Sequence, residues 1–88
     1  MTMLSIFEEL RAERQRQEEK FGDNSMASPS LSDPQRLAIL VEEVGEVAHA
    51  LNEAALSPQD RSAWLVEMRR ELIQVAAVAV AWCEVERI

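Results

Sequence analysis

Cysteine, glycine and basic residues are all scarce in this chain of 88 residues. The single cysteine, Cys83, excludes an internal disulfide, so we expect a protein of the reducing cytoplasm. With only two glycines, the chain has no glycine-rich phosphate-binding loop. Nine lysines and arginines against sixteen aspartates and glutamates give a formal net charge of −7, which argues against a nucleic-acid-binding protein.

Long hydrophobic segments are also absent. The longest nearly uncharged run, residues 72–83, is too short to cross a bilayer as a helix, so we expect no membrane partner. The first ten residues contain Glu8 and Glu9 and do not have the pattern of a signal peptide. Yet 48% of the residues are hydrophobic, which is high for a chain too short to build a large core. This excess favours a homo-oligomer that buries apolar faces between subunits.

What remains predicts an all-α fold of three helices in one domain, residues 1–88. The first helix is expected over about residues 4–21, because strong helix formers dominate there and Gly22 marks the end. Residues 22–33 are rich in Gly, Asn, Ser and Pro, a composition that is typical of a loop.

Two similar signals predict the starts of the other helices. Asp33 and Pro34 indicate the N-cap and the first position of the second helix, which is expected to continue to about Leu56. Residues 57–60 repeat the signal, so the third helix is expected from about Pro58 to near the C-terminus.

Apolar stripes follow the helical period in both of these helices. The stripe that we expect to be the core face of the second helix consists of Leu37, Leu40, Val41, Val44, Ala48, Leu51 and Ala55. The main stripe of the third helix consists of Leu65, Met68, Leu72, Ala76, Ala79 and Cys83. Because the third helix is apolar nearly all round, we expect helices of a second subunit to cover it and complete a helical bundle.

Carboxylates interrupt both apolar helices. Glu43 and Glu46 are three residues apart in one helix, as are Glu71 and Gln74 in the other, so each pair points to one side of its helix. Charged side chains in apolar segments need compensation, and Mg²⁺ or Mn²⁺ is the simplest compensating partner. The four side chains therefore predict a metal site between the helices, with Glu42 suited to orient or deprotonate water. The alternative is that these are surface acids paired with arginines.

The predicted first helix carries a polar group between its apolar ends. Arg14 and Gln17 lie between Leu10 and Phe21 along the inward side, and Lys20 is nearby. An arginine fork and a lysine point charge are suited to bind the oxygens of a triphosphate. The alternative is a solvated, charged helix without a ligand.

Taken together, these motifs resemble a known enzyme family. The segment LVEEVGEV (residues 40–47) followed by ELIQ (residues 71–74) resembles the EExxE and ExxD motifs of the MazG-like all-α nucleoside triphosphate pyrophosphatase superfamily. The segments ERQRQ (residues 13–17) and KFG (residues 20–22) and the tail VAAVAVAW (residues 75–82) resemble its short phage and bacterial members. The resemblance covers most of the chain.

The resemblance implies a fold, a reaction and an assembly. The expected reaction is Mg²⁺-dependent cleavage of a (deoxy)nucleoside triphosphate to the monophosphate and pyrophosphate, for nucleotide-pool control or housecleaning, in a homodimer or homotetramer. Glu43, Glu46 and Glu71 match metal ligands, and Glu42 matches the acid that supports the ligands or activates water. Gln74 stands where the motif has aspartate, so the site has one negative charge fewer. The alternative is therefore a non-catalytic helical dimer that binds a nucleotide or a cation, or an interaction module.

Overall fold

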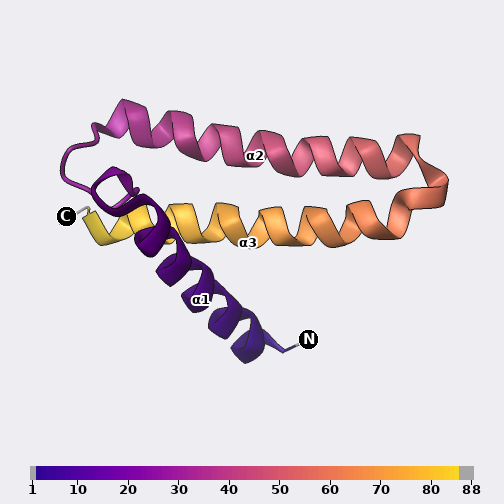
Figure 1. The fold of residues 1–88 in the computed structure, drawn as a ribbon, viewed down its shortest axis with the longest axis horizontal. Helices are drawn as coiled ribbons and strands as arrows, with labels where there is room; N and C mark the ends of the chain where they lie inside the picture. The colour runs from indigo at the N-terminus through magenta and orange to yellow at the C-terminus, as the bar shows by residue number, and fades with distance from the viewer. Residues whose placement is uncertain (1, 86–88) are drawn as a thin grey trace.

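The structure, a computed structural model, describes residues 2–85 as a set of helices (Figure 1). The elements are α1 (Met3–Phe21), a 3-10 turn (Gly22–Asn24), α2 (Asp33–Leu56), a second 3-10 turn (Pro58–Asp60) and α3 (Arg61–Val85). Helices α2 and α3 run side by side in opposite directions, and α1 crosses the C-terminal half of α3 obliquely (Figure 1). The all-α prediction is confirmed for the described residues.

Local signals set both ends of α1. The Thr2 side chain caps the start by accepting a hydrogen bond from the backbone N–H of Ser5. The helix ends where Gly22 adopts a φ of 51°, and the N–H of this glycine donates to the carbonyl of Glu18. The predicted bounds of the first helix are therefore confirmed to within a residue.

The start of α2 differs from the prediction by one residue. Ser32 is the N-cap: its hydroxyl accepts from the N–H of Gln35, whose side-chain oxygen accepts from the N–H of Ser32. The prediction that Asp33 is the cap was wrong, because the glutamine three residues after Ser32 completes this reciprocal pair. At the other turn, helical structure begins at Pro58 as predicted, first as a 3-10 turn.

The core faces of the two long helices also differ from the prediction. In the single chain, the buried residues of α2 are Arg36, Ala50 and Ala54, and those of α3 are Ala77, Val78 and Ala81. Small side chains let the two helices approach closely along this line. The stripe expected to form the core face of α2 lies mostly on the outside, so that prediction was wrong for the single chain.

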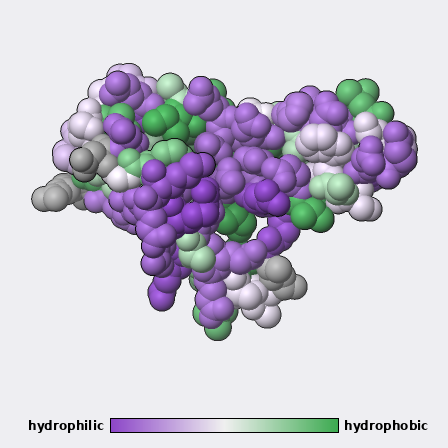
Figure 2. Space-filling model, viewed as in Figure 1, coloured by the Kyte–Doolittle hydropathy of each residue, from purple (hydrophilic) through white to green (hydrophobic). Residues whose placement is uncertain are grey.

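Large apolar side chains are therefore left on the surface. In the expected α2 stripe, Leu37, Val41, Val44 and Leu51 are each at least half exposed, and Leu72 in the expected α3 stripe is 48% exposed. Cys83, also expected on a core stripe, is exposed. Figure 2 shows hydrophobic patches over α2 and near the N-terminal end of α1 on an otherwise mostly hydrophilic face. None of the described helices combines the length and the hydropathy needed to cross a membrane.

Ion pairs hold α1 against α3. Arg69 donates to both carboxylate oxygens of Glu9 at 3.0 and 2.6 Å, and Arg14 donates to both oxygens of Glu84 at 3.2 and 2.6 Å. The buried residue of α1 is Gln17, which is polar. Attachment of this helix thus depends on charge more than on apolar burial.

Candidate functional site

Three oxygen-bearing side chains of α2 and α3 meet where the helices pack together. The end of the Gln74 amide lies 3.2 Å from Glu43 Oε2 and 3.0 Å from Glu71 Oε2. With its nitrogen on this side, the amide donates a hydrogen bond to each carboxylate. With its oxygen on this side, three oxygens face one another. The structure therefore brings together one residue of the EExxE segment and both polar residues of the ELIQ segment.

Burial and like charges make these carboxylates resist ionisation. Desolvation is the largest cause that raises the pKa of Glu43, and the charges of Glu46 and other neighbouring glutamates add to it. Desolvation also raises the pKa of Glu71 most, followed by the charge of Glu43. A cation beside them would favour the ionised forms, because it offsets both effects.

The oxygens fit a small, hard divalent cation. Neighbouring ligands of an octahedral Mg²⁺ lie roughly 3.0 Å apart when each metal–oxygen distance is about 2.1 Å. The two distances from the Gln74 amide are close to this spacing. Within residues 2–85, no three His, Cys, Asp or Glu side chains form a group that could hold a metal ion. A site at this point would therefore use the amide oxygen of Gln74 beside Glu43 and Glu71.

A cleft of about 720 Å³ lies beside this cluster, lined by α1, residues 24–26 and the α2–α3 pair. Glu42, Glu43 and Gln74 contribute acidic and amide groups to its lining. Arg16 of α1 and Arg70 of α3 contribute positive charge. Carboxylates that hold a cation and arginines that bind phosphate oxygens are the groups a metal-bound polyphosphate requires.

Glu46 has a different place from the other predicted ligands. It is exposed and lines a neighbouring hollow of about 430 Å³ together with His49, Trp64 and Glu71. Its charge still contributes to the raised pKa values of Glu43 and Glu71. Glu46 therefore lies near Glu43 and Glu71 but lines the neighbouring hollow instead of the cleft. His49 is exposed and meets the ring of Trp64 edge-on, with 5.7 Å between ring centroids.

Of the three α1 residues predicted to bind phosphates, Gln17 and Lys20 line the cleft and Arg14 does not. The Arg14 guanidinium is engaged by Glu18 and Glu84, with nitrogen–oxygen distances of 2.6 Å to each. The structure thus gives Arg14 a role in joining α1 to α3 instead of the predicted role at a ligand.

Sequence reasoning missed the two arginines that do line the cleft. Arg16 pairs with Glu13 one turn earlier in α1, and Arg70 lies 3.4 Å from Glu67 in α3. Arg16 is four residues before Lys20, and Arg70 is four residues before Gln74. This helical spacing was the signal that could have identified both residues.

Comparison of the chain with protein-family models, with curated proteins and with solved structures finds no match. We therefore base the functional proposal on the residues of the cleft and on the motif resemblance.

Proposed function

We propose that this chain is a Mg²⁺-dependent nucleoside triphosphate pyrophosphohydrolase, which converts a (deoxy)nucleoside triphosphate to the monophosphate and pyrophosphate. The observation that carries the proposal is the meeting of Glu43, Glu71 and Gln74 beside a cleft that also contains Arg16 and Arg70. The MazG-like motif resemblance supports the same reaction.

The proposed metal ligands are Glu43, Glu71 and Gln74. Glu46, which lines the neighbouring hollow with Glu71, contributes negative charge or a further ligand. Mn²⁺ is expected to substitute, because it also prefers oxygen ligands. A bound Mg²⁺ supplies charge neutralisation at the phosphate oxygens. The spacing of the oxygen ligands suits a small cation and supports this assignment. The raised pKa values of Glu43 and Glu71 also support it, because a bound cation would stabilise their ionised forms.

The remaining residues of the cleft receive roles from their chemistry. Glu42 is exposed to the cleft and is proposed to orient the attacking water and take up its proton. Arg16, Lys20 and Arg70 are proposed to bind the phosphate oxygens, with Gln17 as a neutral donor. Hydrolysis then breaks the bond between the α-phosphorus and the oxygen that bridges it to the β-phosphorus, and pyrophosphate leaves with that oxygen.

We further propose that the protein acts in the cytoplasm as a homodimer or homotetramer. The half-exposed leucines and valines of the α2 stripe support an oligomer, because a contiguous apolar surface is stabilised by burial against another copy. The exposed single cysteine supports a reducing compartment.

One observation favours the non-catalytic alternative, in which the helical dimer binds a nucleotide or a cation without hydrolysis. The Gln74 amide, with its nitrogen toward the carboxylates, joins Glu43 to Glu71 with two hydrogen bonds and so replaces the bridging function of a metal. The variant Gln74→Asp separates the two functions. Activity that appears only in this variant would identify the natural protein as a binding module.

The direct test is pyrophosphate release from a panel of canonical and modified nucleoside triphosphates, with Mg²⁺, Mn²⁺ or EDTA. Glu43→Gln keeps the shape of the side chain and removes its charge, and it should abolish metal-dependent release. Glu53→Gln makes the same change on α2 outside the cleft and should leave release unchanged. Release that persists in Glu43→Gln, or that ignores EDTA, would contradict the proposed site.

A further inference from the structure

The cleft changes character along its length. At one end lie Glu43, Arg70 and the Gln74 amide. Val78 lies four residues beyond Gln74 and eight beyond Arg70 on α3, about 6 and 12 Å away by helix rise. Val78 packs with Met26 and Ala81, and Ile39 of α2 packs against this cluster. The cleft therefore has a charged end and an apolar end, which is the polarity of a nucleoside triphosphate.

The wall at the apolar end comes from the loop between α1 and α2. Asn24, Ser25 and Met26 line the cleft there, so the wall offers an amide and an apolar surface, while Ser25 is 3% exposed and its side chain hydrogen-bonds Glu18. These groups suit a nucleobase, which is held by hydrogen bonds to its edge and by apolar contact with its faces. The chain leaves the 3-10 turn at Asn24, and the irregular segment that follows makes a defined wall only if its backbone is held in place.

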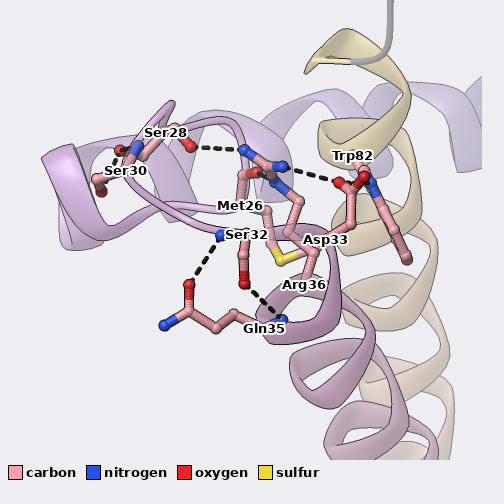
Figure 3. Close-up of polar contacts among 8 residues, drawn as sticks. All are labelled: Met26, Ser28, Ser30, Ser32, Asp33, Gln35, Arg36 and Trp82. Atoms are coloured by element: carbon pink, nitrogen blue, oxygen red, sulfur yellow. Dashed lines mark hydrogen bonds and ion pairs between the residues drawn. The ribbon is translucent and has the colours of Figure 1, made fainter.

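Arg36 of α2 holds this backbone in place through hydrogen bonds to its carbonyl groups. It is 4% exposed, and its Nε donates to the carbonyl of Met26 at 2.9 Å while Nη2 donates to the carbonyl of Ser28 at 2.6 Å. Its Nη1 donates to Asp33 Oδ1 at 3.0 Å, and this oxygen also accepts from Trp82 Nε1 of α3 at 3.2 Å. Figure 3 shows the guanidinium between the loop and the start of α2, with Trp82 beyond Asp33.

Only an arginine supplies this combination. Its planar fork presents donors in several fixed directions, here to two carbonyls and a carboxylate at once. The burial of the charge is tolerated because each of the three guanidinium nitrogens donates a hydrogen bond. Arg36 thus links the loop to α2 directly and to α3 through Asp33 and Trp82.

We propose that residues 24–26 form the nucleobase wall of the cleft and that Arg36 is the positioning residue that sets this wall in place. The inference rests on the proposed function and extends it: phosphates are bound at the Glu43–Arg70 end, and the base is selected at the Met26 end. Arg36 touches no substrate in this scheme and acts through the loop.

The test separates the two ends of the cleft with two probes. One is the canonical nucleoside triphosphate that the wild-type protein turns over fastest, and the other is inorganic tripolyphosphate as a competitive inhibitor. In Arg36→Lys, KM for the nucleotide should rise about tenfold with kcat nearly unchanged, while the inhibition constant of tripolyphosphate stays the same. Asp33→Asn, at an exposed position, should give a smaller change in the same direction and covers the case in which Arg36→Lys does not fold.

Arg61→Lys is the matched control, since Arg61 is an exposed arginine at the start of α3 that does not line the cleft. An unchanged KM in both Arg36→Lys and Asp33→Asn would overturn the inference and leave the proposed function standing. So would an inhibition constant of tripolyphosphate that rises together with KM. If the wild-type protein shows no turnover, the dissociation constants of tripolyphosphate and of the canonical nucleoside triphosphate that binds most tightly replace the kinetic constants. Absence of binding by both probes would overturn the proposed function and this inference together.

Discussion

Replacement of Gln74 by glutamate tests the site at its centre. The amide lies 3.2 and 3.0 Å from carboxylate oxygens of Glu43 and Glu71, and Gln74→Glu places a third carboxylate of equal length there. In EDTA the variant loses two hydrogen bonds to charged groups, each worth about 1.5–3 kcal/mol. It also gains like-charge repulsion, of which protonation of one carboxyl relieves a part. The free energy of unfolding should fall by about 3 kcal/mol or more, out of roughly 4–13 kcal/mol for a domain of this size.

Mg²⁺ should narrow the difference in stability between Gln74→Glu and wild type. The third carboxylate that destabilises the metal-free site is a better ligand than an amide, so Gln74→Glu should bind the cation more tightly than wild type. A ligand present at 100 times its dissociation constant stabilises the folded state by about 2.7 kcal/mol. Most of the loss in EDTA should therefore be recovered at saturating Mg²⁺.

The assay is urea unfolding followed by far-UV circular dichroism, in EDTA and in Mg²⁺, with Gln74→Met as the control of similar size without charge. The methionine variant should lose stability in EDTA and gain little from Mg²⁺. Equal stability of Gln74→Glu and wild type in EDTA would refute the assigned contacts. An equal Mg²⁺ response of the glutamate and methionine variants would refute the cation site.

Three further predictions follow from the fold and its charges. In EDTA, the free energy of unfolding should decrease as pH rises above 4.5, the pKa of a glutamate in the unfolded chain, because the raised pKa values of Glu43 and Glu71 make the folded state bind more protons than the unfolded state. Urea titrations between pH 5 and 7 measure this slope, and Glu43→Gln should flatten it. Val44→Glu should convert the expected oligomer to monomers in light scattering, since Val44 is 51% exposed in the single chain and burial of a charge in an interface is costly; an unchanged mass would exclude this face as the interface. Ser32→Ala should lower the free energy of unfolding by about 1 kcal/mol, whereas Ser32→Asp should retain it, and equal stability of both variants would refute the assigned cap.

The helix bounds were predictable because they depend on neighbours in the sequence. Gly22 supplies a backbone conformation that other residues adopt reluctantly, and Pro58 begins a helix without losing a hydrogen bond. The error at the start of α2 had the same local origin: Ser32 and Asp33 are both good caps, and the position of Gln35 decides between them. Such choices are readable from the sequence once the reciprocal partner is considered.

The direction of each apolar face was not predictable in this way. Periodicity identifies the stripe through Val41 and Val44, but it does not say whether the partner is a helix of the same chain. Within the chain, the small residues Ala50 and Ala54 make the contact, because they allow a closer approach. Arg16 was missed for a related reason: α1 is polar on most sides, so its sequence does not fix which side faces α3.

The attachment of α1 has a consequence for how ionic strength acts on the protein. Exposed ion pairs such as Arg69–Glu9 contribute little to stability, and salt screens them over about 8 Å at physiological concentration. The α2–α3 hairpin, by contrast, is held by buried alanines and valine that salt does not weaken. The cleft therefore has one wall on a salt-insensitive hairpin and the other, with Arg16 and Lys20, on a helix that salt loosens. Rising salt should therefore weaken the proposed phosphate binding twice, once by screening the ligand and once by releasing the helix that presents these cations.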